Sequence, residues 1–240
     1  MNTIHALSYD SIEFQEGRYT VKTLDTVEER QAAYRLRHKI FAKMLQWVPC
    51  RADELEVDDY DTTGVTVGLF NDQGQLLGAV RMLPSSGPFM LEREFRSFVD
   101  PEYTIRKEID TMEITRLAVD PTVGGKGLSA RLMVRLFKGM YQWCLANDIR
   151  YCYLEVEQYF LRIIRVLGFP CEAIGPVVLV PPANVSSQAA LLDLDRFRLE
   201  SALQRPEFLK WMTETNPVRL TNPWAIQPRL GHSAVQAVNA

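Results

Sequence analysis

The stretch GGKGLSARLMVRLFKGMYQWCLANDIRYCYLEV, residues 124–156, determines the fold class that the sequence predicts. Glycines open it, and behind them Leu132, Leu136 and Met140 recur at the spacing of one apolar stripe on a long helix. The apolar run 151–156 then has the length and composition of a buried strand. A glycine-rich turn, a long helix and a strand in this order indicate an α/β unit built on a sheet.

The flanking segments extend this pattern. Thr26 and Glu29 form a capping box at the start of a helix, and the turn 71–74 joins two strand-like runs as a hairpin. Helices on both sides of 151–156 favour parallel pairing of that strand, so we predict one mixed sheet flanked by helices. The expected elements are a helix at 25–45, strands at 64–70 and 75–83, a loop and short helix at 85–95, a strand at 112–120, the long helix at 124–148, a strand at 151–156, a helix at 157–169, a strand at 172–180 and an amphipathic helix at about 186–204.

The organisation of the chain is that of one principal domain. Residues 1–20 are polar and predict no regular element. The core is expected to end near two consecutive prolines, so residues 1–182 are assigned to the domain. Residues 183–240 are expected to form a C-terminal helix and tail that pack on, or extend from, the same domain.

Composition excludes several classes of function. The chain has 240 residues, a net charge of −3 and 24% charged residues, which is typical of a globular protein and not of one that binds nucleic acid. No apolar run is long enough to span a membrane, and the first residues do not resemble a secretory signal. The four cysteines show no metal-ligand spacing and the histidines are scattered, so we expect reduced thiols, a cytoplasmic location and no metal site.

An acidic stretch, ELEVDDYD at residues 54–61, allows two interpretations. It is either a solvated surface loop or a set of carboxylates that holds a cation. Upstream, Arg37 and Phe41 are four residues apart and share one helical face, and Trp47 lies beyond the helix end. Aromatic rings beside carboxylates suit an organic cation, whereas the alternative is an aromatic pair in a small core.

Two further motifs carry charges or glycines where chemistry could occur. In EITR, alternation along a strand places Glu113 and Thr115 on one face and Arg116 on the other, and a charge in such a strand needs a partner or a ligand. Arg81 closes the second hairpin strand and is placed to neutralise the acidic stretch. The turn 122–131 either cradles the phosphates of a coenzyme A or phosphopantetheine arm or is an ordinary strand-to-helix turn.

Together these residues resemble the acyl-homoserine lactone synthases of the LuxI type, which make bacterial quorum-sensing signals. The resemblance covers residues 24–180 and keeps the order and spacing of the family's motifs, while Met44, Pro49 and the glycine-rich turn depart from them. The matching positions are Arg37, Phe41, Trp47, Glu56, Asp58, Tyr60, Asp61, Arg81, Phe95, Glu113 and Arg116.

The resemblance implies a GNAT-like N-acyltransferase fold of the α/β (α+β) class and a two-step reaction. The amine of S-adenosylmethionine, a substrate and not a cofactor, is acylated by a thioester on acyl carrier protein or coenzyme A. The homoserine carboxylate then displaces the sulfonium and releases methylthioadenosine. No cofactor, metal or nucleic acid is implied, and the oligomeric state stays open. The alternatives are an acyltransferase that acts on another amine without lactone formation, or a non-catalytic module that binds the acyl group or S-adenosylmethionine.

The residue roles that we expect follow from this reaction. Glu113 is the expected general base, with Asp61 second and Arg116 completing the catalytic set, and backbone N–H groups near 117–119 meet the oxyanion. Among the acids, we rank Asp61 first for ligand contact, then Asp58, with Glu56 bracing an arginine. The expected S-adenosylmethionine site consists of Arg37, Phe41, Trp47, Asp58, Asp61 and Arg116. The expected supporting network consists of Glu56, Arg81 and Phe95. The expected phosphopantetheine and acyl site consists of Lys126, Gly127, Arg131, Met133, Phe137, Tyr153 and Val156, with Leu136 nearby.

Overall fold

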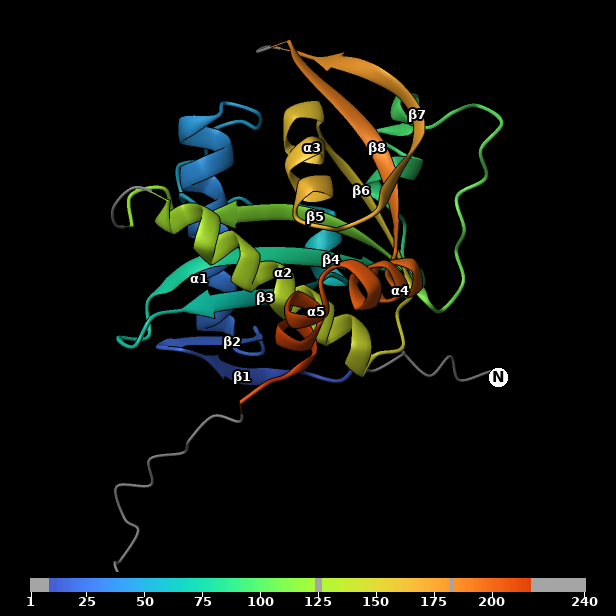
Figure 1. Cartoon of the computed structure of the whole chain (residues 1–240). Helices are drawn as coiled ribbons and strands as arrows, with labels where there is room; N and C mark the ends of the chain where they lie inside the picture. Colours follow the sequence, from blue (N-terminus) through green and yellow to red (C-terminus); the bar gives the residue numbers. More distant parts are fainter. Residues whose placement is uncertain (1–8, 124–126, 182–183, 217–240) are drawn as a thin grey trace, which may run out of the picture.

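The computed structural model describes residues 9–123, 127–181 and 184–216. Within these residues, the centre of the fold is a single eight-stranded sheet in the order β1-β2-β3-β4-β5-β6-β8-β7 (Figure 1). Strands β5 and β6 pair in parallel, and the other neighbours are antiparallel. The strands are β1 (Glu13–Glu16), β2 (Tyr19–Thr23), β3 (Val65–Phe70), β4 (Leu76–Pro84), β5 (Thr111–Val119), β6 (Tyr151–Glu157), β7 (Cys171–Val180) and β8 (Val185–Asp193).

Helices cover both faces of the sheet, and alternation along β4 shows which face each one covers. Ala79 packs in the apolar cluster with α1, whereas its neighbour Val80 packs in the larger cluster with α2. In Figure 1, α2 lies in front of the sheet and α1 behind it. The helices are α1 (Val27–Arg37), α2 (Leu128–Ala146), α3 (Gln158–Val166), α4 (Leu194–Gln204) and α5 (Pro206–Thr213), with the short helical segments η1 (His38–Met44), η2 (Asp59–Thr62), η3 (Met90–Glu92) and η4 (Arg96–Phe98).

The first helix changes type where the sequence predicted one continuous helix. The capping box of Thr26 and Glu29 is present, and α1 ends at Arg37. The next seven residues form a π-helix, in which Leu45 donates to the carbonyl of Ile40, five residues back. Such segments are rare and are often found at functional sites. The wider turn changes the direction of the side chains that follow Arg37.

The hairpin and the strands around the long helix agree with prediction. In the turn of the β3–β4 hairpin, the side-chain oxygen of Asn71 accepts hydrogen bonds from the backbone of Gln73 and Gln75. Strand β5 pairs in parallel with β6 only from Thr111 to Ile114. Beyond that point β5 continues along β4, and β6 continues along β8. The two central strands therefore part midway along their length, which opens a gap in the sheet.

Two segments differ from the prediction. Part of the polar N-terminal region forms β1 and β2, an antiparallel pair at one edge of the sheet. The expected helix at about 186–204 is wrong in its first half, because residues 185–193 form β8 and only α4 is helical. Strand β8 lies between β6 and β7, so the segment after residue 183 supplies a strand of the sheet. Register with two neighbours outweighs the local helix preference of its alanines.

Three further features of the described residues concern membrane-spanning helices, metal-binding groups and disulfides. Among the helices that the structure describes, none has both the length and the apolar character that crossing a bilayer requires. In the same ranges, no group of three or more His, Cys, Asp or Glu side chains is arranged to hold a metal ion. The four cysteines are free thiols, and the buried Cys144 and Cys152 place their sulfur atoms 3.9 Å apart.

Candidate active site

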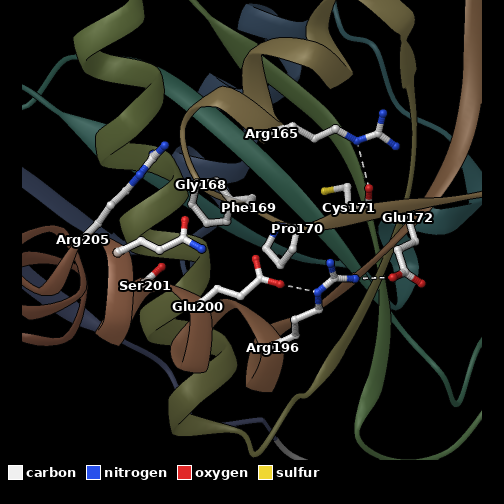
Figure 2. Close-up of a pocket in the computed structure, with 11 residues that line it drawn as sticks. Arg165, Gly168, Phe169, Pro170, Cys171, Glu172, Arg196, Glu200, Ser201 and Arg205 are labelled. Atoms are coloured by element: carbon white, nitrogen blue, oxygen red, sulfur yellow. Dashed lines mark hydrogen bonds and ion pairs between the residues drawn. The ribbon is translucent and has the colours of Figure 1, made fainter.

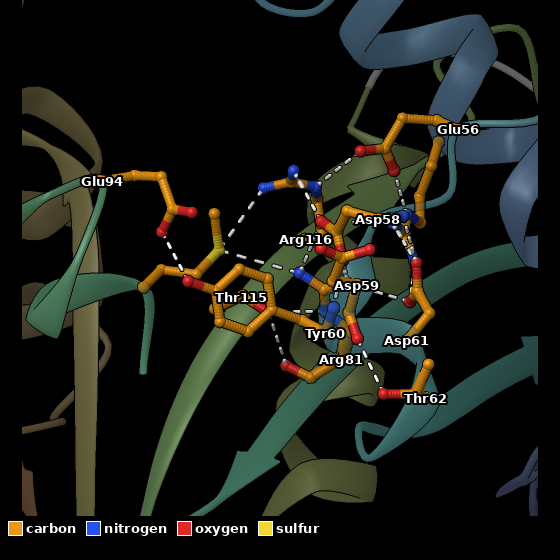
Figure 3. Close-up of polar contacts among 12 residues, drawn as sticks. Glu56, Asp58, Asp59, Tyr60, Asp61, Thr62, Arg81, Glu94, Thr115 and Arg116 are labelled. Atoms are coloured by element: carbon orange, nitrogen blue, oxygen red, sulfur yellow. Dashed lines mark hydrogen bonds and ion pairs between the residues drawn. The ribbon is translucent and has the colours of Figure 1, made fainter. Parts of the chain in front are cut away.

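A closed ring of alternating positive and negative side chains lies on the α1 face of the sheet (Figure 3). Each arginine in it bonds two carboxylates, and each carboxylate bonds two arginines. In order round the ring, the members are Glu56, Arg37, Asp61, Arg81, Asp58 and Arg116, which bonds back to Glu56. The structure thus brings together all six charged residues that we assigned to the expected S-adenosylmethionine site and its supporting network. Buried charges are tolerated when each has such partners.

Four separate segments of the chain supply the ring. Arg37 is the last residue of α1, Arg81 lies on β4 and Arg116 lies on β5. Glu56 and Asp58 come from the loop that leads into η2, and Asp61 lies in η2 itself. Arg37 grips Asp61 with two bonds, Nη1 to Oδ1 at 2.6 Å and Nη2 to Oδ2 at 3.0 Å. Arg81 Nη1 reaches the same Oδ1 at 2.8 Å. The two-pronged geometry fixes the acidic loop against the sheet.

One edge of the ring is open to solvent. The side chains of Asp58 and Arg116 are 24% and 16% exposed, and they are joined at 3.0 Å between Oδ2 and Nη2. The other four ring side chains are at most 7% exposed. Burial alone would raise the pKa of Asp61, but hydrogen bonds and charge from Arg37 and Arg81 hold this pKa below its ordinary value. Asp58 is therefore the most exposed acid of the ring, whereas Asp61, which we rank first for ligand contact, is almost fully buried.

Arg116 reaches the ring because the strand is irregular at this residue. Its φ is +52°, in the left-handed region that non-glycine residues rarely adopt. The register with β4 shifts here, so that Arg116 and Leu117 together oppose the single residue Val80, as in a β-bulge. Simple alternation predicted that Arg116 and Thr115 point to opposite faces. That expectation is wrong, because Arg116 shares Asp58 with Arg81, the cross-strand partner of Thr115.

Aromatic side chains border the ring on one side. Phe41 and Trp47 stack with their ring centroids 6.0 Å apart and an interplanar angle of 20°. The guanidinium of Arg116 lies 5.7 Å from the centroid of Phe41. Phe41 is buried, whereas Trp47 is 43% exposed and offers an open aromatic surface. Phe95 is not part of this group, since it packs edge-on against Phe98 in a separate apolar cluster.

Glu113 lies beneath the ring and supports it indirectly. Its carboxylate accepts hydrogen bonds from the backbone N–H of Met90 at 2.6 Å and of Leu91 at 3.1 Å, and the residue is only 1% exposed. The sulfur of Met90 in turn lies 3.7 Å from nitrogen atoms of both Arg81 and Arg116. Burial raises the pKa of Glu113 to about 8, although the two backbone donors act in the opposite direction. Both oxygens are already engaged, so Glu113 anchors the segment that carries Met90.

An apolar cavity of about 80 Å³ fills the gap where β5 and β6 part. Phe137 and Val156, which we predicted to line an acyl site, both line this cavity. Tyr153 does not, because it lies where β5 and β6 are still paired, and it packs against Phe89. The complete lining is Val80, Ile114, Thr115, Arg116, Leu117, Phe137, Met140, Leu154, Glu155, Val156, Phe160, Ile164, Phe169, Cys171 and Leu192, so neither Met133 nor Leu136 takes part.

The polar end of this cavity meets the ring. Arg116 belongs to both, and Thr115 and Glu155 lie beside it in the cavity wall. Sequence reasoning missed Glu155, although a single acid in the apolar run YCYLEV is the same kind of signal that singled out EITR. Burial raises the pKa of Glu155. A charged site and an apolar pocket are thus continuous through one arginine.

The glycine-rich turn is only partly covered by the structure. Gly127 precedes α2 with a φ of +78°, so the first backbone N–H groups of the helix follow a residue without a side chain. Lys126 lies outside the described residues. Arg131 is exposed and lines a different hollow with Glu16 and Trp211. The structure therefore does not bring Arg131 to the apolar cavity.

A surface hollow of about 280 Å³ lies between α3, the start of β7 and α4 (Figure 2). Its charged groups are largely paired with each other, since Arg196 bonds both Glu172 and Glu200. No ring residue lines it. Phe169 and Cys171 line both this hollow and the apolar cavity, so they form a partition between the two.

Comparisons with known proteins show what the chain is similar to. The sequence profile of the autoinducer synthase family matches residues 22–201. An acyl-homoserine-lactone synthase of Rhizobium radiobacter is 30% identical over 171 residues, which cover 70% of this chain and 79% of the relative.

Solved structures show the same fold. A CoA-dependent acyl-homoserine lactone synthase, with SAM and isopentyl-CoA, superposes with a TM-score of 0.62 at 23% identity, over 78% of this chain and 81% of that one. An N-acyl amino acid synthase from uncultured soil microbes superposes with a TM-score of 0.56 at 19% identity, over 78% and 96% of the two chains. Both similarities confirm the predicted mixed sheet flanked by helices.

Proposed function

The chain belongs to the autoinducer synthase family and is an acyl-homoserine-lactone synthase, and we propose how its site carries out the reaction. An acyl group passes from a thioester to the amine of S-adenosylmethionine, and lactone closure then releases methylthioadenosine. The observation that supports this proposal is that Arg116 belongs both to the charged ring and to the wall of the apolar cavity. A charged amino-acid head group and an apolar chain would meet at that residue.

S-adenosylmethionine would bind at the open edge of the ring. Its amino-acid end carries one positive and one negative group, which complement the exposed pair of Asp58 and Arg116. The exposed ring of Trp47, stacked on Phe41, would form a wall for the adenosine or the sulfonium. Arg37 and Arg81, which each bond two ring carboxylates, would hold Asp58 and its loop in place.

The predicted general bases have structural roles in this proposal. Asp61 accepts bonds from Arg37 and Arg81, and Glu113 accepts bonds from two backbone groups. Neither has a free oxygen that faces the cavity. We therefore assign both to positioning: Asp61 fixes the ring, and Glu113 fixes the segment of Met90.

The acyl group would lie in the cavity with its carbonyl at the polar end. The bulge at Arg116 and Leu117 interrupts the regular pairing of β5 with β4. A backbone N–H group at the bulge would bind the oxyanion of the tetrahedral adduct. Lactone closure is intramolecular, so its main requirement is a carboxylate held behind the carbon that bears the sulfonium. Arg116 is the residue placed to hold it.

The acyl carrier is either acyl carrier protein or coenzyme A. The relative solved with isopentyl-CoA is named as CoA-dependent. In this chain the first backbone N–H groups of α2, after Gly127, have no partner within the helix and would suit the phosphate of either carrier. We propose a cytoplasmic reaction, since buried, unlinked thiols such as Cys144 and Cys152 fit a reducing compartment.

A two-product assay tests the function. Purified protein would be supplied with S-adenosylmethionine and matched acyl thioesters on acyl carrier protein and on coenzyme A. Equal amounts of methylthioadenosine and acyl-homoserine lactone, quantified by mass spectrometry, are the expected result. An acylated amine without methylthioadenosine would instead indicate an acyltransferase that forms no lactone. A protein named as an N-acyl amino acid synthase is among those that share this fold.

A further inference from the structure

We propose that Glu155 is a catalytic residue that takes a proton from the substrate amine at the mouth of the acyl cavity. The inference rests on the proposed function, because it assumes that an amine attacks a thioester at this point. Glu155 lies on β6 and lines the cavity together with Thr115 and Arg116. It is the only carboxylate among the residues that line that cavity in the described part of the chain.

The position of Glu155 follows from the register of the sheet. Parallel pairing of β5 with β6 ends at Ile114 and Leu154, so Glu155 is the first residue of β6 beyond the pairing. Alternation turns Glu155 to the same face as Tyr153 and away from Leu154 and Val156. The ring also lies on this face. An amine held by Asp58 and a thioester held in the cavity would therefore approach each other next to Glu155.

The charged and polar groups that act on Glu155 lie on three strands. Arg116 faces it from β5, Glu157 from β6 itself, and the hydroxyl of Ser187 from β8. Burial raises the pKa of Glu155 and the negative charge of Glu157 raises it further, while Ser187 and Arg116 lower it. Across residues 9–123, 127–181 and 184–216, no salt bridge involves its carboxylate. A carboxylate with a raised pKa is a stronger base. The hydroxyl of Ser187 hydrogen-bonds to this one, and a carboxylate has further lone pairs that can accept a proton.

Proton balance defines the step. The ammonium of S-adenosylmethionine first loses a proton to Glu155, which frees the nitrogen lone pair. The nitrogen then attacks the thioester carbon, and a C–N bond forms as the carbonyl electrons move to oxygen. When the adduct collapses, the C–S bond breaks and the second nitrogen proton ends on the departing thiolate. Glu155 returns its proton to solvent, so no further reactant is needed.

The test compares four substitutions in the full chain: Glu155→Gln, Glu155→Asp, Glu157→Gln and Glu113→Gln. Glu155→Gln is expected to lower kcat for thiol release by about 100-fold or more, the usual contribution of a general base, with KM for S-adenosylmethionine changed only a few-fold. The rise of the rate with pH should disappear. Glu157→Gln is the matched control, and it should keep kcat and move the rise to lower pH because one negative neighbour is gone. Glu155→Asp should recover part of the rate.

Other outcomes separate the inference from the proposed function. A Glu155→Gln enzyme with the wild-type kcat and pH profile would overturn the inference, as would loss of the pH-dependent rise in Glu113→Gln alone. Thermal melting and binding of S-adenosylmethionine are measured in parallel, and a rate loss matched by loss of fold or binding would also count against a catalytic role. If the wild-type chain releases thiol but no methylthioadenosine, the proposed function fails, while the comparison of thiol-release rates still decides the role of Glu155.

Discussion

Arg37 and Arg116 share one carboxylate, that of Glu56. The Nε atom of Arg37 bonds Oε2, and the Nε atom of Arg116 bonds Oε1 at 3.0 Å. Glu56 thereby links the end of α1 to the bulge in β5. The geometry of the open edge of the ring, where we propose that S-adenosylmethionine binds, consequently depends on a residue that is almost fully buried.

Replacement of Glu56 by glutamine should destabilise the protein as well as the site. The change leaves two arginines short of a negative partner in a buried place, a loss that typically costs about 3–5 kcal/mol. Urea unfolding should show a lower midpoint, and calorimetry should show weaker binding of S-adenosylmethionine. Asp59→Asn, an exposed change in the same loop, is the control and should leave both unchanged. Equal effects of the two variants would mean that the ring is not what holds the loop.

Replacement of Asp58 by asparagine should act on ligand binding more than on stability. Asp58 is the most exposed ring acid, so its loss removes a ligand contact at a smaller folding cost. A hydrogen bond to a charged group contributes about 1.5–3 kcal/mol, which predicts a rise in KM for S-adenosylmethionine of roughly 10- to 100-fold. Steady-state kinetics should show little change in KM for the acyl donor. A larger effect on the acyl donor would contradict the assignment.

The buried Glu113 should make stability depend on pH in a defined direction. Its pKa is raised to about 8 in the folded chain, whereas an unfolded glutamate titrates near its ordinary value of 4.5. Between these values the folded state holds more protons than the unfolded state, so stability falls as pH rises and levels off above pH 8. Glu113→Gln lacks this dependence.

The measurement for Glu113 is the gap in urea midpoint between the wild-type chain and Glu113→Gln. From pH 5.5 to pH 8.5 the urea midpoint of the wild-type chain should fall relative to that of Glu113→Gln. Asp61 has a lowered pKa and affects stability only at more acidic pH, so it does not interfere in this window. A gap that stays constant across the range would show that the carboxyl group is ionised throughout.

Phe169 should limit the length of the acyl chain. It forms part of the partition between the apolar cavity and the hollow of Figure 2. Phe169→Leu removes part of that wall, and mass spectrometry of the lactones should then show a shift toward longer chains. Phe208→Leu is a matched control, because Phe208 packs against Phe169 but does not line the cavity. The same shift in both variants would point to a general loosening of the core.

Much of the fold could be predicted because local signals and long-range packing agree there. The capping box at Thr26, the turn at 71–74 and the apolar stripe of α2 each specify an element on their own. Strand β8 was missed because alanine, serine and glutamine prefer a helix or no structure, and only pairing with β6 and β7 makes them a strand. Residues 19–23 alternate buried and partly exposed positions, yet the run is too short and polar to predict β2.

The charged part of the site was predictable and its connections were not. Spacing identified the six ring residues, but it gave no measure of exposure, so Asp61 was ranked above Asp58. Strand alternation placed Arg116 on the wrong face because a bulge is a tertiary event that spacing does not encode. Glu155 was overlooked because its importance depends on where β5 and β6 stop pairing.

The order of strands in the sheet also has a consequence for synthesis. In the described fold β7 pairs only with β8, which follows it in the chain and separates it from β6. When β7 emerges from the ribosome, β8 has not yet been made. The backbone N–H and C=O groups of β7 therefore stay unpaired until β8 is synthesised. A transcript that ends after residue 182 would thus yield a chain with an orphan strand and an unclosed acyl cavity, since Leu192 of β8 forms part of that wall.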